Sequence, residues 1–161
     1  MYLLDTNIIF DAFNNYPREV FPSYWQKFEE FIHNQAFYFH ETVKDEIYRR
    51  EDEAAAWFRE SVPDSSVLFK DDAEITSYAE VTQWVRHGRQ PAYEVPAVRQ
   101  FLGVADSWII ASAHARGYTI ISNEKRNPRK ITAVKLPDVA DAFEIPYFTG
   151  LEFFRHQGIT F

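Results

Sequence analysis

The chain has 161 residues, and its 46% hydrophobic content is typical of one packed domain rather than a disordered chain. It contains no cysteine, which excludes disulfides, thiolate zinc sites and a cysteine nucleophile. The net charge of −7 argues against a nucleic-acid partner, unless several acidic side chains gather around a divalent cation and make the site locally positive.

Apolar and aromatic stretches in the first half of the chain predict strands that alternate with helices. In order, we expect a strand at Met1–Leu4, a helix opening at Ile8–Phe13, a helix from about Ser23 to Asn34 and a strand at Ala36–Phe39. A helix N-capped by Thr42 and running to Arg50 should follow, with further helix at Glu51–Ser61. A turn at Pro63–Ser66 and an edge strand at Val67–Phe69 complete this half. Such alternation is typical of a parallel sheet that helices cover on both faces.

The second half of the chain continues this pattern and contains its clearest helix, a small-residue segment at Val104–Arg116 followed by a glycine stop. The other expected elements are a helix from Asp71 or Asp72 to Gly88, a loop at Gln90–Pro96, a buried strand at Tyr118–Ser122, a basic loop at Lys125–Lys130, a short strand within Ile131–Leu136 and short helices at Pro137–Phe143 and Thr149–Arg155. No repeat or linker divides the chain, so we expect a single domain over residues 1–161.

Four acidic residues occupy corresponding places in these elements. Asp5 and Glu124 follow predicted strands, while Glu46 and Asp106 lie on predicted helices. Because the carboxyl ends of parallel strands and the beginnings of the following helices share one edge of a sheet, the four carboxylates are expected to converge. Oxygen ligands select hard cations such as Mg²⁺ or Mn²⁺, which activate water for phosphoryl displacement.

The sequence around these acids resembles the PIN-domain nuclease family in the family's order along the chain. Leu4–Ile9 is similar to its first motif, Val43–Ile47 to its second acidic helix, and Ala105–Ala111 to its third motif, in which an Asp opens a small-residue helix. Ile120–Glu124 falls where the fourth acidic or polar position follows the penultimate strand. Many members carry Asp there, whereas this chain carries Asn followed by Glu.

The resemblance implies an α/β, PIN-like three-layer fold with a central parallel sheet of about four to five strands flanked by helices. It also implies an endoribonuclease that hydrolyses RNA phosphodiester bonds with Mg²⁺ or Mn²⁺. Asp5, Asp106 and Glu124 would bind the metal, and Glu46 would complete the site or orient the attacking water.

The resemblance further assigns supporting roles and partners. Asn7 is expected to hold Asp5 by a hydrogen bond, and Thr6 or Ser107 to cap a helix or contact phosphate. Small bacterial or archaeal members are commonly toxins that an antitoxin protein holds inactive. We therefore expect an RNA substrate, an antitoxin partner and a homodimer.

Basic residues cluster directly after Glu124, at Lys125, Arg126, Arg129 and Lys130. This run is either a solvated loop or a phosphate-binding arm beside the acids. Arg86–Arg89 is a second, weaker candidate for RNA contact. Asp138 and Asp141 are lesser substitutes for Glu124, and the five histidines show no metal-ligand spacing.

Two other functions compete with the nuclease. A non-catalytic PIN-like module would bind RNA or protein with the same fold but without the metal site. A phosphatase of the HAD-like type would use a strand-end Asp as its nucleophile and would need a second Asp two residues later, where this chain has Asn7. We expect a soluble, cytoplasmic protein, because no apolar run approaches the roughly 20 residues of a membrane span and Met1 leads directly into a strand.

Overall fold

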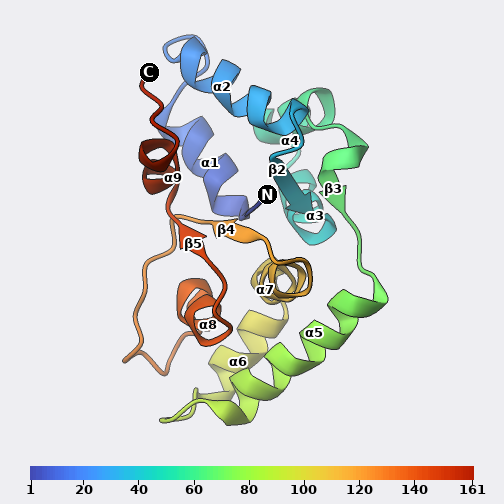
Figure 1. Ribbon diagram of the computed structural model, residues 1–161, viewed down its shortest axis with the longest axis vertical. Coiled ribbons are helices and arrows are strands. Elements are labelled where there is room, and N and C mark those ends of the chain that lie inside the picture. Colours follow the sequence, from blue (N-terminus) through green and yellow to red (C-terminus); the bar gives the residue numbers. More distant parts are fainter.

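A computed structural model describes all residues, Met1–Phe161, and its centre is a parallel sheet of 5 strands (Figure 1). The strands are β1 (Tyr2–Leu4), β2 (Phe37–His40), β3 (Val67–Leu68), β4 (Thr119–Ile121) and β5 (Tyr147–Phe148). Their order is β3-β2-β1-β4-β5, and every neighbouring pair is parallel. In the central register Leu4 pairs with Phe39 on one side and with Ile121 on the other. The predicted α/β fold with a parallel sheet is thus confirmed.

Nine α-helices surround the sheet: α1 (Thr6–Asn15), α2 (Pro22–His33), α3 (Glu41–Tyr48), α4 (Glu53–Ser61), α5 (Asp72–Gln83), α6 (Val95–Leu102), α7 (Ala105–Arg116), α8 (Leu136–Ala142) and α9 (Gly150–His156). A 3₁₀ turn covers Asp64–Ser66, and a π-helical turn covers Trp84–Gly88. Helix α7 contacts β1, β2 and β4, and also the long helix α5, which lies with α6 at the lower end of the molecule in Figure 1. None of these helices is both long and apolar enough to span a lipid bilayer.

The hydrophobic core packs against both faces of these short strands. Leu3, Leu4 and Ile120 of the central strands are fully buried, as expected for strands covered on both faces. Aromatic rings fill the space under α2 and α9, where Phe37 and Phe153 have ring centroids 5.1 Å apart. Gly117 ends α7 with φ of 66°, a left-handed conformation that glycine adopts without steric cost.

Two elements of the second half were missed. Helix α6 was predicted in part as the loop Gln90–Pro96, but Pro96 occupies the first turn of the helix, where no backbone donor is needed. Strand β5 was not predicted, because its two residues are too few for a pattern. The strand predicted within Ile131–Leu136 is wrong: β5 takes the edge position beside β4, and Leu136 begins α8.

The start of α3 also differs from the prediction. Its N-cap is His40, whose side chain accepts a hydrogen bond from the backbone N–H of Thr42, so Thr42 is not the cap. The predicted continuation at Glu51–Ser61 is a separate helix, α4, because Asp52 caps a new start at Glu53. Glu46 consequently lies in the last turns of a short helix and points toward the sheet edge described below.

Candidate active site

The site begins where β1 and β4 end side by side. Asp5 follows β1, and its backbone N–H donates to the Ile121 carbonyl of β4 at 3.0 Å. The next residue along β4, Ser122, is fully buried and donates its hydroxyl to Asp5 Oδ2 at 2.6 Å. Asn7 donates to the same oxygen at 2.5 Å. Two donors therefore fix one oxygen of a carboxylate that is itself only 6% exposed.

Asn7 and Ser122 also tie the two strand ends together. The Asn7 amide oxygen accepts from the Asn123 backbone N–H at 3.0 Å, and its Nδ2 lies 3.0 Å from Ser122 Oγ. The Ser122 hydroxyl in turn accepts from the Glu124 backbone N–H at 3.1 Å. The sequence reasoning missed Ser122, although its position directly after a buried strand is the same signal that identified Asp5.

Glu46 reaches this edge from α3. Its Oε2 accepts from the Thr6 hydroxyl at 2.7 Å, and its Oε1 accepts from the backbone N–H of Ala105 at 3.1 Å. Because Ala105 is the first residue of α7, the carboxylate satisfies a donor at the positive end of that helix. Thr6 therefore positions Glu46 and is not the helix cap, which is Asp5; its predicted contact with phosphate stays a prediction.

Asp106 follows in the first turn of α7, and its carboxyl group makes no hydrogen bond or ion pair within the protein. Burial raises the pKa of Asp106 to about 8, with further contributions from the negative charges of Asp5, Glu124 and Glu46. Burial also raises the pKa of Asp5 to about 6, against the hydrogen bond from Ser122 and with the charge of Glu124 adding to the shift. The four acids thus share one electrostatic environment.

Glu124 is held away from this centre. Its Oε1 accepts from Lys135 Nζ and its Oε2 from the Leu136 backbone N–H, both at 2.6 Å. Leu136 begins α8, so this carboxylate has the same relation to α8 that Glu46 has to α7. As arranged, no three acidic or histidine side chains stand close enough together to hold one ion.

The oxygen donors of Asp5 and Asp106 would suit the chemistry of a hard divalent cation. Both carboxylates are desolvated, and their neighbours are other carboxylates, which disfavours the charged forms. A divalent ion between them would relieve that repulsion, and oxygen-only donors match Mg²⁺ or Mn²⁺. In this arrangement Glu46 and Glu124 each accept two hydrogen bonds from the protein.

Other predicted residues take different roles. Ser107 is fully buried and donates to the carbonyl of Val104 at 3.3 Å, and Val104 rather than Ser107 is the N-cap of α7. The predicted contact of Ser107 with phosphate stays a prediction. Asp141 pairs with Arg126 at 2.8 Å, and Asp138 accepts from the Asn127 backbone N–H at 3.1 Å. Neither aspartate is free to replace Glu124.

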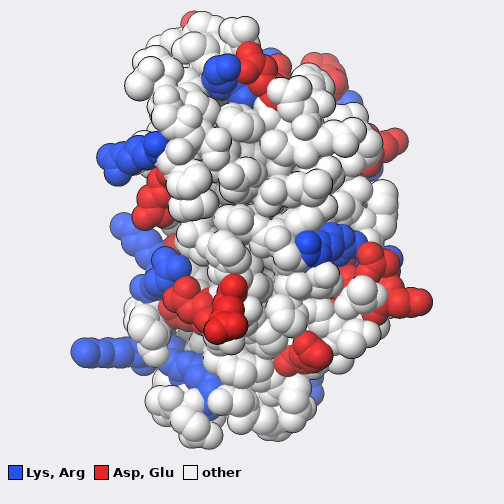
Figure 2. Space-filling model, viewed as in Figure 1, with Lys and Arg blue, Asp and Glu red and all other residues white.

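The basic loop after β4 runs along one edge of the molecule, where Figure 2 shows Lys and Arg side chains. Lys125, Arg129 and Lys130 are exposed and have no carboxylate within salt-bridge distance, whereas Arg126 is paired. Arg89 is buried and donates to the carbonyls of Pro128 and Lys130 at 2.5 and 3.3 Å. Arg89 therefore holds the loop in place, which corrects its prediction as an RNA contact.

The fold defines a structural class. The parallel five-stranded sheet with acids at its carboxyl edge is a PIN-like fold, as the sequence resemblance implied. FitAB bound to an IR36 DNA fragment contains a chain with 19% identity and a TM-score of 0.60, matched over 92% of this chain and 94% of that one. VapBC2 from Rickettsia felis, bound to a promoter DNA fragment, gives 15% identity, a TM-score of 0.57 and coverage of 92% and 97%. At these identities the likeness concerns the fold alone.

FitAcB from Neisseria gonorrhoeae gives the same picture, with 19% identity, a TM-score of 0.56 and coverage of 92% of this chain and 96% of that one. The chain belongs to the family described as Domain of unknown function (DUF4411), which matches residues 2–161. No curated protein sequence matches it.

Proposed function

We propose that the protein is a metal-dependent endoribonuclease, the toxin of a bacterial or archaeal type II toxin–antitoxin module. The observation that carries this proposal is the carboxyl group of Asp106, which is partly buried, makes no hydrogen bond, and lies in the field of Asp5. A partly desolvated acid that has no partner and lies beside other acids costs free energy that a purely structural role does not require.

Asp5 and Asp106 would hold Mg²⁺ or Mn²⁺, which when bound supplies charge neutralisation at the phosphate and a water of lowered pKa. The protein's own residues prepare the site. Asn7 and Ser122 orient the Asp5 carboxylate through its Oδ2 atom. Such outer partners fix the direction of a ligand before the metal arrives.

Glu46 and Glu124 would act from the rim of the site. Each is anchored by a backbone N–H at the start of a helix, Ala105 for Glu46 and Leu136 for Glu124. Carboxylates fixed in this way can accept a proton from water or keep a metal-bound water oriented. Lys135 offsets the charge of Glu124.

An RNA substrate is supported by unpaired cations near the acids. Lys125, Arg129 and Lys130 are exposed, without an acidic partner, on the loop that begins beside Glu124. Exposed Arg86 and Arg99 lie on the neighbouring segment, which Arg89 joins to this loop through the Lys130 carbonyl. Phosphate contacts of this kind supply most of the sequence-independent affinity for nucleic acid.

A protein partner is supported by the fold relatives, which are described as VapBC and FitAB complexes. By analogy we propose an antitoxin that covers the acidic edge, a homodimer and a cytoplasmic location. Expression of the chain alone in bacteria should then arrest growth, and the Asp106→Asn variant should not. Equal growth of cells carrying the two forms would remove the toxin role.

Cleavage of single-stranded RNA in Mg²⁺ or Mn²⁺ tests the enzyme directly. We expect Asp5→Asn and Asp106→Asn to lower the rate at least about a hundredfold, because each removes a charged metal ligand. Asp45→Asn is the matched control, since Asp45 is exposed on α3 and makes no hydrogen bond through its side chain. Cleavage that survives both substitutions, or that is absent in every divalent metal, contradicts the enzyme.

The non-catalytic binding module remains the second candidate, because no three acidic or histidine side chains are arranged to hold an ion. It predicts RNA binding that is unaffected by Mn²⁺ and by Asp106→Asn. Filter binding with a non-cleavable RNA separates the two functions: the nuclease predicts tighter binding with Mn²⁺ in the wild type only.

A further inference from the structure

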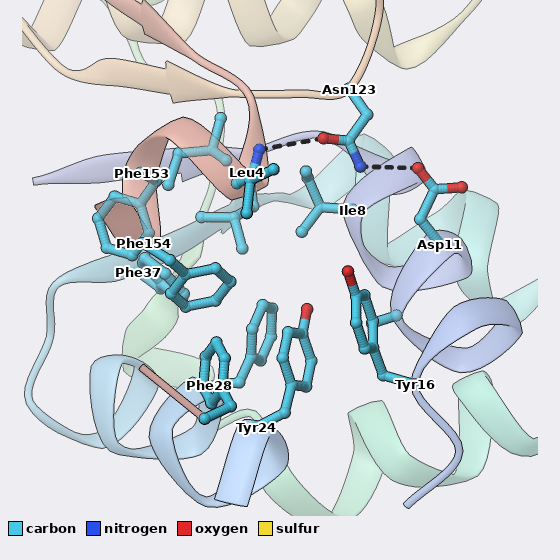
Figure 3. Close-up of a pocket in the computed structure, with 15 residues that line it drawn as sticks. Leu4, Ile8, Asp11, Tyr16, Tyr24, Phe28, Phe37, Asn123, Phe153 and Phe154 are labelled. Carbon is cyan, nitrogen blue, oxygen red and sulfur yellow. Dashed lines mark hydrogen bonds between the residues drawn. The ribbon is translucent and has the colours of Figure 1, made fainter. Parts of the chain in front are cut away.

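A cavity of about 110 Å³ lies between the end of the central strand β1, helices α1 and α2, and the C-terminal helix α9 (Figure 3). Its wall is mostly apolar and includes Leu4, Ile8, Phe28, Phe37, Phe153 and Phe154. Aromatic rings from α2 and α9 thus face one hollow, on the side of α1 that carries Asp11. The proposed nuclease function does not use this cavity.

The polar side of the cavity contains two tyrosine hydroxyls without partners. Tyr24 is only 5% exposed, and neither its hydroxyl nor that of Tyr16 makes a hydrogen bond within the protein. Both hydroxyl groups point toward the side of the cavity where Asp11 lies (Figure 3). Burial raises the pKa of Tyr24, and the nearby Tyr16 and Asp11 raise it further. Neither hydroxyl is among the fully buried unpaired polar atoms of the protein, so both are free to bond to a ligand in the cavity.

One carboxylate oxygen of Asp11 is free to accept a hydrogen bond from a ligand. Its Oδ2 accepts from Asn123 Nδ2 at 2.7 Å, while the Asn123 amide oxygen accepts from the Gly150 backbone N–H at 3.0 Å. This arrangement fixes the direction of the Asp11 side chain and leaves Oδ1 without a protein donor. No lysine, arginine or histidine lines the cavity, so the charge of Asp11 is not neutralised there.

We infer that this cavity binds a small free organic cation, an alkylammonium ion of about four to six heavy atoms. Its apolar body would fill the space between the rings, whose negative faces attract a cation. Its ammonium group would donate to Asp11 Oδ1 and to the hydroxyl of Tyr24. The size follows from the volume, because a cavity of about 150 Å³ holds a benzene molecule.

Other ligand types fit less well. An anion would meet the Asp11 carboxylate and no cation. A neutral hydrocarbon would fill the apolar part of the cavity but would make no use of the Asp11 carboxylate or the Tyr24 hydroxyl. The ammonium ion is the one simple group that satisfies the rings, the carboxylate and the hydroxyls together.

Titration with isobutylammonium chloride, followed by ¹H–¹⁵N correlation spectra of the full chain, tests the inference. We expect saturable shift changes confined to amides around the cavity, such as Ile8, Ala12 and Gly150. Isobutanol, which has the same shape without the charge, should bind about tenfold more weakly or worse. Equal affinity for the alcohol, or no saturable change with the amine against a sodium chloride blank, overturns the proposal.

Two variants test whether the bound cation contacts Asp11 and Tyr24. Asp11→Asn keeps the oxygen that accepts from Asn123 but removes the charge, and we expect isobutylammonium to bind about tenfold more weakly. Tyr24→Phe keeps the ring and should weaken binding severalfold. Asp64→Asn is the control, since that side chain is 95% exposed and lies outside the cavity. Unchanged affinity in Asp11→Asn, with folding verified by its spectrum, would show that the charge plays no part and would refute the inference.

Discussion

Two groups of charged side chains are built around residues at the ends of neighbouring strands, and they are built in opposite ways. At the end of β2, His40 Nε2 is 2.6 Å from Glu74 Oε1, and Glu74 Oε2 is paired with Arg116. At the end of β1, Asp5 and Asp106 have only other carboxylates as charged neighbours close by, apart from Lys135. The first group is balanced within the chain, and the second is not.

The difference separates a structural role from a functional one. Glu74 is fully buried, yet its partners come from α7 and β2, so it joins three elements that support the site. His40 Nδ1 accepts from the Thr42 backbone N–H, which leaves its Nε2 to face Glu74. Removing one partner of a buried charge pair is destabilising, whereas neighbouring acids without a cationic partner are candidates for a functional site.

The largest expected effect is on the balanced group. Glu74→Ala should lower the free energy of unfolding by about 3 kcal/mol, because it leaves Arg116 and His40 without their buried partner. Urea unfolding followed by circular dichroism measures this change. Glu80→Ala, an exposed acid on the same helix, is the control and should cost much less. Comparable losses in both variants would contradict the structural role of Glu74.

Substitution in the second group, which contains Asp5 and Asp106, should raise the free energy of unfolding rather than lower it. Asp106→Asn is expected to stabilise the metal-free protein at pH 8 by about 2 kcal/mol, since it removes a buried charge that its neighbours repel. The same variant should lose RNA cleavage, so stability and activity would change in opposite senses. Chelator-treated protein and urea unfolding provide the measurement; a destabilised variant would mean that Asp106 is balanced after all.

The pH dependence of stability is a second test of the difference between the two groups. The pKa of Asp5 rises from 3.8 to about 6 and that of Asp106 from 3.8 to about 8 on folding. Stability from these groups is complete below pH 3.8 and is lost as the pH rises through the folded values, because the unfolded state releases its protons first. Between pH 5 and pH 8 the metal-free wild type should therefore lose stability by about 1 to 2 kcal/mol relative to Asp106→Asn. Parallel stability curves for the two proteins would contradict this prediction.

The smallest effect is that of the metal on folding. Mn²⁺ at ten times its dissociation constant should stabilise the wild type by about 1.4 kcal/mol, through binding to the folded state alone. Glu74→Gln should keep this gain, and Asp106→Asn should lose it. Thermal unfolding with Mn²⁺ against a chelator tests it, and an equal gain in Asp106→Asn would place the ion elsewhere.

Much of the fold was readable from local patterns. The run Tyr118–Ser122 predicted a buried strand, and β4 covers Thr119–Ile121. The end of the preceding helix at Gly117 was also predicted, and in the structure Gly117 ends α7 in a left-handed conformation. The start of α6 was not, since a proline marks a loop and a helix beginning equally well. Strand β5 depends on pairing with β4 rather than on its own two residues.

The sequence by itself determined that a parallel α/β sheet would bring Asp5 and Asp106 to one edge, because hydrophobic periodicity and strand-end position are local properties. Only the tertiary structure decided what each side chain does there. Glu46 bonds to Ala105, 59 residues away, and Glu124 turns to Lys135 and the start of α8. Such contacts arise when the chain closes on itself, and no local pattern encodes which donor a carboxylate will find.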